Sequence, residues 1–295
     1  MDARKARKWT VFLLCSLVMQ APHSARAVST DGEGIDTQFI FGFTSGADVG
    51  DLGDKEIEHQ TIAQFGKRDG SYAALRDELR YETSPIENFR FEFGPVLSFY
   101  DITGVIGLDD RRQGSFDGLV AEFRYKLLDR RRAPFALTLG AEPRWGRFDE
   151  TSGAPADRYS SEFLLAADTE LSKGLIFAAL NLVYEPEAVR SRRTGEWQQN
   201  ATIGVFAAVT TRIRPELFVG MEARYLRSYD GFGLNSLTGE ALFAGPTMYL
   251  HLSKTLAISG ALGIQAAGHA VNVPGFLDLT NFTRYQATFR LEYNF

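Results

Sequence analysis

Charged side chains recur at every second position along much of this sequence. In one run, Glu122, Arg124 and Lys126 alternate with apolar residues. Alternate residues of a β-strand point to the same face, so these charges share one side of a strand. The full set contains ten basic and eleven acidic residues: Arg76, Glu78, Arg80, Glu82, Arg90, Glu92, Glu122, Arg124, Lys126, Glu142, Arg144, Glu162, Asp168, Glu170, Glu185, Arg212, Glu222, Arg224, Arg284, Arg290 and Glu292.

This near balance of charge leaves two interpretations open. In the first, the groups form cross-strand ion pairs that only support the structure. In the second, they line a path for solutes, and walls of opposite sign orient polar or zwitterionic molecules without strong preference for anions or cations. Under both, the polar face meets water or its own counter-charges, because an apolar interior cannot hold successive charges.

Catalytic and metal-binding chemistry has less support. The histidines beyond residue 27 are His59, His251 and His269, and none has a second His or Cys at ligand spacing, so no metal site is predicted. His269 is expected at an outer rim, near Ser228, Asp230 and Ser236 in the preceding loop. A rim hydrolase acting on lipids is therefore a third interpretation. No catalytic residue and no cofactor is assigned, because no phosphate loop, calcium loop or HExxH run occurs.

The first 27 residues have the pattern of a cleaved signal peptide. Four basic residues precede the apolar run Trp9 to Met19, which leads to Ala25-Arg26-Ala27. The run is about half of the roughly 20 residues that a spanning helix needs. Cleavage after Ala27 removes the only cysteine, Cys15, which excludes disulfides from the exported chain, and lipidation at Cys15 is disfavoured by Leu14. The remaining 27 basic and 36 acidic residues give a charge of about −9, which argues against a nucleic-acid partner.

From residue 55 onward the hydrophobic period is two, which predicts strands. At the C-terminus all apolar residues from Tyr285 to Phe295 fall on one face and all polar residues on the other. The same template predicts twelve strands, near 55–67, 71–83, 89–101, 115–128, 134–147, 159–172, 175–187, 198–213, 215–227, 239–252, 255–267 and 283–295.

From the second strand onward, short and long connections alternate, as in an up-and-down barrel that crosses an outer membrane. The long ones are residues 102–114, 148–158, 188–197, 228–238 and 268–282. In hydrocarbon, strands pair all their backbone groups only by closing on themselves. The fold class is therefore all-β, a transmembrane antiparallel barrel of about twelve strands over 55–295. Residues 28–54 form a lead that is either an extra strand or a plug.

Three local features qualify this prediction. The stretch 255–277 carries no Asp, Glu, Lys or Arg, so a membrane helix competes there, although its apolar parity and glycines favour a strand. By parity Asp77 falls on the lipid face, so we expect it at the rim or next to a bulge. The acidic pieces Asp109-Asp110 and Asp149-Glu150 are expected to be solvated loop tips rather than calcium or lipopolysaccharide sites.

Residues 55–295 resemble a Gram-negative outer-membrane β-barrel protein. The most specific part is the final strand, where Phe289, Leu291, Tyr293 and the terminal Phe295 alternate like the C-terminal signal of this class. The resemblance implies location in the cell outer membrane, recognition by the barrel-assembly machinery, and contact with outer-membrane lipids and lipopolysaccharide. It gives neither an activity nor an oligomeric state.

The leading interpretation is a narrow pore or uptake channel for small solutes, and not an enzyme. It follows from the charged lumen and from a barrel size between filled eight-strand barrels and open porins. The alternative is a structural or surface-interaction barrel with a closed, ion-paired lumen, whose loops 102–114 and 268–282 carry its function.

Overall fold

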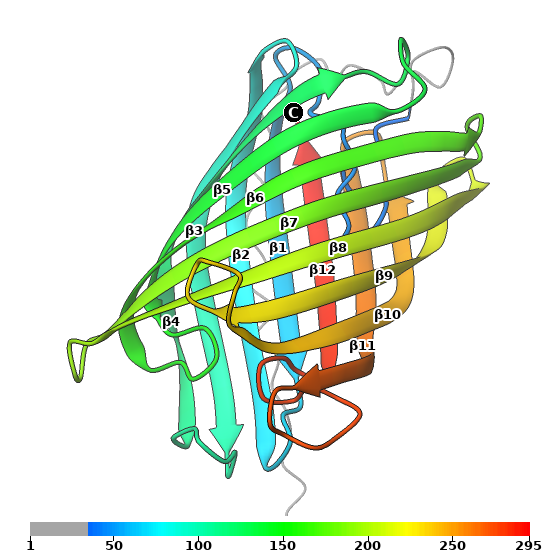
Figure 1. The fold of residues 1–295 in the computed structure, drawn as a ribbon. Helices are drawn as coiled ribbons and strands as arrows, with labels where there is room; N and C mark the ends of the chain where they lie inside the picture. The colour runs from blue at the N-terminus through cyan, green and yellow to red at the C-terminus, as the bar shows by residue number, and fades with distance from the viewer. Residues whose placement is uncertain (1–34) are drawn as a thin grey trace, which may run out of the picture.

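The computed structural model describes residues 35–295. The predicted signal peptide and its cleavage site lie outside the described residues. Twelve antiparallel strands close into one barrel in which each strand pairs with its neighbours in sequence and β1 pairs with β12 (Figure 1). The predicted fold class is thereby confirmed.

The strands are between 10 and 18 residues long. Their bounds are β1 Lys55–Phe65, β2 Ser71–Ile86, β3 Phe89–Thr103, β4 Arg111–Leu128, β5 Ala136–Phe148, β6 Pro155–Ser172, β7 Ile176–Ser191, β8 Trp197–Arg214, β9 Leu217–Asp230, β10 Leu237–His251, β11 Leu256–Ala270 and β12 Tyr285–Asn294. Several strands extend into residues that were predicted to lie in loops. For example, β4 begins at Arg111 because residues 111–114 pair with residues 99–102 of β3.

Connections of different length gather at the two ends of the barrel. The end that holds Phe295 carries the connections 87–88, 129–135, 173–175, 215–216 and 252–255, most of them short, and is called the short-turn rim (Figure 1). The opposite end, the long-loop rim, carries residues 66–70, 104–110, 149–154, 192–196, 231–236 and 271–284. Residues 35–295 contain no helix long and apolar enough to cross a membrane. Of the stretch 255–277, for which a helix competed, residues 256–270 form β11 and the rest lies in loops.

The two faces of the barrel wall differ as the period of two requires. Large apolar side chains such as Phe93, Leu119 and Leu180 are exposed on the outside. Charged residues at the intervening positions, such as Arg90 and Glu92, are buried inside. The residues of the C-terminal signal, Phe289, Tyr293 and Phe295, belong to the outward set. An apolar belt around a polar lumen is the arrangement of a transmembrane barrel.

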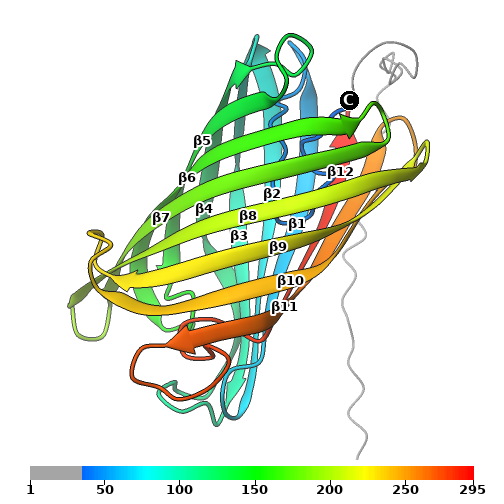
Figure 2. The same cartoon turned by 45° about the vertical axis from the view of Figure 1, so that its right-hand side comes forward.

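Residues 35–54, called the inner segment, form turns rather than a strand. Thr37, Ile40 and Phe41 are almost fully buried, at 0–1% exposure. The segment lies inside the barrel towards the short-turn rim, where its blue trace runs behind the strands (Figure 2). The lumen is therefore occupied by the chain's own N-terminal residues at that end.

Candidate functional site in the barrel lumen

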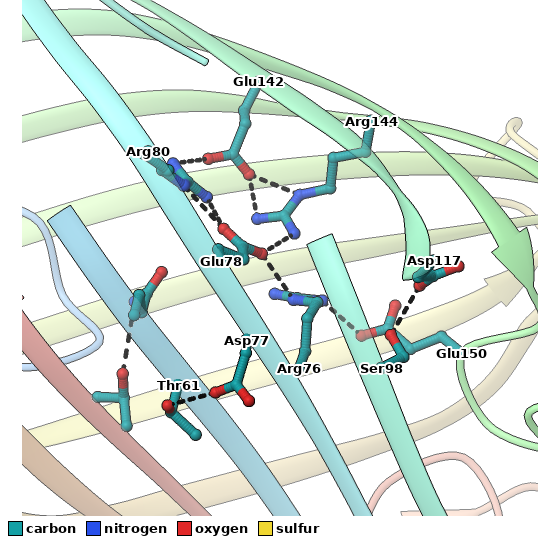
Figure 3. Close-up of polar contacts among 12 residues, drawn as sticks. Thr61, Arg76, Asp77, Glu78, Arg80, Ser98, Asp117, Glu142, Arg144 and Glu150 are labelled. Atoms are coloured by element: carbon teal, nitrogen blue, oxygen red, sulfur yellow. Dashed lines mark hydrogen bonds and ion pairs between the residues drawn. The ribbon is translucent and has the colours of Figure 1, made fainter. Parts of the chain in front are cut away.

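An ion-pair network fills the lumen along β2 to β5 (Figure 3). Arg80 Nη1 lies 3.1 Å from Glu92 Oε2 and 2.8 Å from Glu142 Oε2, and its guanidinium also pairs with Glu78. Arg144 Nη1 lies 2.7 Å from Glu78 Oε1. Because Arg80 on β2 reaches Glu142 on β5 past two intervening strands, the network bridges non-adjacent strands through the lumen.

The acidic members of this wall stand opposite one another. Glu56, Glu82, Glu92 and Glu122 occupy paired positions on β1 to β4, and Glu142 is paired in the same way with Glu162 on β6. Like charges directly opposite each other destabilise a sheet. The intervening arginines offset this repulsion, and Arg90 Nη2 lies 2.6 Å from Glu92 and 2.9 Å from Glu122.

Polar anchors hold the inner segment to the wall. The Thr37 hydroxyl and the Ala47 N–H both donate to Asp168 Oδ2 on β6, at 2.5 and 2.6 Å. The backbone N–H groups of Phe43 and Thr44 donate to Glu222 Oε2 on β9, at 3.1 and 3.0 Å. Backbone and hydroxyl donors of the segment thus bond to Asp168 Oδ2 and Glu222 Oε2, and Arg130 and Arg224 supply nearby positive charge.

Charge also fixes the segment to the short-turn rim. Asp48 lies 2.5 Å from Arg130, in the connection between β4 and β5, and 3.5 Å from Lys126. Burial would raise the pKa of Asp48, but the cations Arg130 and Lys126 outweigh burial and hold the pKa below its usual value. The ionised form of Asp48 is therefore the form that the docked segment favours.

The apolar part of the inner segment packs against the opposite side of the lumen, on β7 to β11. Phe39, Ile40 and Phe41 form one buried cluster with wall residues Phe177, Ala179, Ala208, Phe218, Tyr249 and Ala257. The segment approaches the wall closely at Gly42, where an added Cβ would lie only 2.7 Å from Ala261 Cβ. Beside it, the Arg224 guanidinium lies 3.7 Å from the centre of the Phe43 ring, a cation–π contact.

The loop 149–154 folds inward from the long-loop rim. Glu150 pairs with Arg76 at 2.7 Å and with Arg158 at 2.6 Å, and the Tyr72 hydroxyl donates to the Thr151 carbonyl at 2.9 Å. Burial raises the pKa of Glu150, but Arg76 and Arg158 outweigh burial and lower the pKa to about 2. The prediction of a solvated loop tip is wrong for Glu150, because buried arginines that need a counter-charge lie beneath the loop. A cavity of ≈ 20 Å³ beside Glu150 has room for about one water molecule.

The loop 271–284 covers another part of the same rim. Asp278 is fully buried and accepts from the Asn281 N–H at 2.9 Å. The Lys67 ammonium donates to the carbonyls of Thr280 and Phe282 at 3.0 and 3.1 Å. Burial lowers the pKa of Lys67 to about 8. Both rims are thus partly closed by segments that bond to the barrel through polar groups.

Most residues predicted to line the lumen lie on its inner face. Twelve of them are buried: Glu78, Arg80, Glu82, Arg90, Glu92, Glu122, Arg124, Glu142, Asp168, Glu222, Arg224 and Glu292. Eight are half-buried: Arg76, Lys126, Arg144, Glu162, Glu170, Glu185, Arg212 and Arg290. Arg284 is the correction: it is exposed and precedes β12, and its guanidinium lies 5.4 Å from the Tyr285 ring centre. Its backbone bonds to Gly66 and Gln265, and its place at the long-loop rim leaves the side chain exposed.

Sequence reasoning missed several members of the site. Glu56 and Glu58 on β1 are buried in the lumen, and their alternation with Ile57 and His59 carried the signal. Arg158 lay in a predicted loop although it belongs to β6, where it pairs with Asp117 and Glu150. Nothing local in the sequence marks Thr37 or Asp48 as lumen residues.

Two residues with unusual predictions lie on the outer face. Asp77 lies beside a bulge, since it pairs with Leu97 where β3 shifts register against β4. It accepts from the Thr61 hydroxyl at 2.5 Å and lies 3.8 Å from His59 Nε2, so polar neighbours reduce the cost of the charge at a lipid-facing position. His269 is exposed and faces Glu240 across β10 and β11.

A family model matches residues 33–295, which include the whole barrel and the inner segment. The chain belongs to the family of unknown function DUF6662. A search of curated proteins finds no match.

Solved structures resemble the barrel at low sequence identity. The COG4313 outer membrane channel from Pseudomonas putida F1 is 12% identical with a TM-score of 0.57, covering 84% of this chain and 98% of that one. The translocator domain of the autotransporter NalP from Neisseria meningitidis is 11% identical with a TM-score of 0.48, covering 84% and 91%. The toluene transporter TodX of P. putida is 7% identical with a TM-score of 0.42, covering 90% and 98%. The first likeness supports the fold that the sequence resemblance implied, that of a Gram-negative outer-membrane β-barrel.

Proposed function

We propose that this protein is an outer-membrane channel for small polar solutes and that the inner segment is its gate. The observation that carries the proposal is the way in which the segment is held. Its anchors, Asp168, Glu222 and Arg130, are groups that water can solvate when the segment leaves. Such a segment separates from the wall at lower cost than one buried only by apolar packing.

The route that departure would open runs along β7 to β11. The other side of the lumen carries the network around Arg80. This side carries the Glu222–Arg224 pair, the aromatic cluster, and a set of small or neutral polar residues: Ala179, Asn181, Ala208, Thr210, Thr247, Ser259 and Ala261. The inner segment occupies this side, where Ser45 N–H donates to Asn181 at 2.7 Å. A path with one densely charged wall and one wall of fewer charges suits polar or zwitterionic solutes.

The apolar outer face supports insertion in the outer membrane, with the short-turn rim towards the periplasm. Under this proposal outer-membrane lipids and lipopolysaccharide contact the belt, and the barrel-assembly machinery recognises β12. Under the same proposal, residues 1–27 direct export and are cleaved after Ala27.

Single-channel recording in planar bilayers tests the proposal. The refolded chain from residue 28 is compared with a chain that begins at residue 55. We expect rare openings in the first and larger, sustained conductance steps in the second. Asp168→Asn, which weakens two anchors of the segment, should increase openings, whereas Asp129→Asn, which changes an exposed pair with Arg131, should not.

Silence in both chains would overturn the channel and favour the second candidate, a structural barrel with a closed lumen. The observation that favours this candidate is the reach of Arg80 from β2 to β5. Equal conductance in both chains would keep the channel but remove the gate.

A further inference from the structure

Three buried glutamates at the short-turn half of the lumen converge on one point. Glu58 on β1, Glu82 on β2 and Glu92 on β3 each place a carboxylate oxygen within 4.8 Å of the other two. Their exposures are 1%, 4% and 1%. Neighbouring strands supply all three, so the barrel wall itself fixes their separation.

Around this point, buried carboxylate oxygens lack donors. Glu58 Oε1 lies 3.0 Å from Arg290 Nε, but Glu58 Oε2 has no hydrogen-bond partner among the described residues. Glu56 Oε1 and Glu292 Oε1 are also unpartnered, in residues that are only 7% and 3% exposed. Both interact electrostatically with Glu58, and Glu292 stands opposite Glu58 across β1 and β12. Unpartnered buried oxygens are costly, so they point to a cation that would satisfy them.

The local charge count points the same way. Glu56, Glu58, Glu82, Glu92 and Glu292 supply five carboxylates, and three guanidinium groups contact them: those of Arg80, Arg90 and Arg290. Arg80 and Arg90 are shared with Glu78, Glu122 and Glu142. The excess is therefore at least two negative charges, which one divalent cation would neutralise.

We propose that Glu58, Glu82 and Glu92 bind a divalent cation, Ca²⁺ in preference to softer metals, with Glu56 and Glu292 as charged neighbours. Hard carboxylate oxygens suit Ca²⁺, whose oxygen ligands lie at about 2.3–2.6 Å. Two ligands of such an ion lie at most about 5 Å apart, and these three oxygens lie within 4.8 Å of one another.

The inner segment covers the proposed site. Gln38 Nε2 donates to Glu82 Oε2 at 2.8 Å, and the Phe39 ring centre lies 4.2 Å from the Arg290 guanidinium. The site goes beyond the proposed function, because the carboxylates belong to the wall and remain together whether or not the segment acts as a gate.

Terbium luminescence tests the proposal on the refolded chain from residue 28, stripped with EDTA and then freed of it. Tyr249 can sensitise Tb³⁺ in this site, because it is close enough to Glu292 to interact with that carboxylate. We expect saturable Tb³⁺ emission that Ca²⁺ displaces, and at least tenfold weaker binding in Glu58→Gln and Glu82→Gln. Glu162→Gln is the matched control, since Glu162 faces the same lumen from β6 and should leave binding unchanged.

Thermal unfolding of the unmodified chain supplies a second measurement that needs no variant. A ligand that binds only the folded barrel stabilises it by RT ln(1 + L/Kd), where L is the free ligand concentration, so the midpoint rises with the logarithm of that concentration above Kd. We expect added Ca²⁺ to raise the midpoint and EDTA to lower it. Unchanged midpoints, or Tb³⁺ binding that is equal in Glu58→Gln and Glu162→Gln, would overturn the site. An EDTA-insensitive chain that Glu58→Gln stabilises at neutral pH would show that protons neutralise the cluster instead, which also overturns it.

Discussion

Gly42 is the position where a single added methyl group should release the inner segment. Its backbone has φ +87°, which costs an L-residue about 1–2 kcal/mol. A Cβ there would also lie 2.7 Å from Ala261 Cβ and 2.8 Å from Thr247 Cγ2. Overpacking of this kind costs about 1–3 kcal/mol. Gly42→Ala should therefore weaken docking of the segment by about 2–5 kcal/mol.

Gly53 separates the two contributions. It belongs to the same segment and has φ +90°, but a Cβ there would have no neighbour within 4 Å. Gly53→Ala therefore measures the backbone cost alone, which corresponds to about a 5- to 30-fold increase in local opening. The extra contact at Gly42 should add a further factor of about 5 to 150.

Limited proteolysis within residues 35–54 is the assay, under conditions in which cleavage is slow compared with reclosing, so that the rate follows the open population. Ala261→Gly in the Gly42→Ala background removes the nearest clashing atom and should recover part of the protection. Equal cleavage rates in Gly42→Ala and Gly53→Ala, or no recovery with Ala261→Gly, would refute the packing of Gly42 against β10 and β11.

Three further outcomes are expected. Replacing Arg80 by Met leaves Glu78, Glu92 and Glu142 without a shared counter-charge and should destabilise the barrel by about 3–5 kcal/mol. Urea unfolding in lipid vesicles measures this loss, and Arg131→Met, at an exposed position, is the near-neutral control. Asp168→Asn weakens the acceptor for Thr37, Ala47 and Arg130 and should speed proteolysis of the inner segment about tenfold or more, whereas equal rates in Asp129→Asn would contradict this anchor. The pKa of Glu150 is lowered to about 2 in the docked loop, so the stabilisation that ionised Glu150 gives the loop is fully present above the ordinary pKa of 4.5 and is lost as the pH falls through about 2. A spin label at Thr151→Cys should therefore gain mobility as the pH falls from 4.5 to about 2. In the Glu150→Gln variant the label should be mobile already at pH 7.

The strands and the two faces of the wall follow from the sequence alone. Period two is a local property, so Phe289 and Tyr293 were placed outside, and Arg290 and Glu292 inside, without knowledge of the partner strand. Strand number followed for the same reason. Parity did not predict the exposure of Arg284, which lies at the long-loop rim although its backbone bonds to Gly66 and Gln265.

Only the tertiary structure decided how the lumen is occupied. Thr37 meets Asp168 across 131 positions of chain, and Arg80 meets Glu142 across 62. Closure also sets Glu58, Glu82 and Glu92 together from three strands, which is why spacing along the chain did not predict a cation site there. Alternation shows which side chains enter the barrel, but which of them meet depends on register, strand tilt and the inner segment, and these are settled by contacts between residues far apart in sequence.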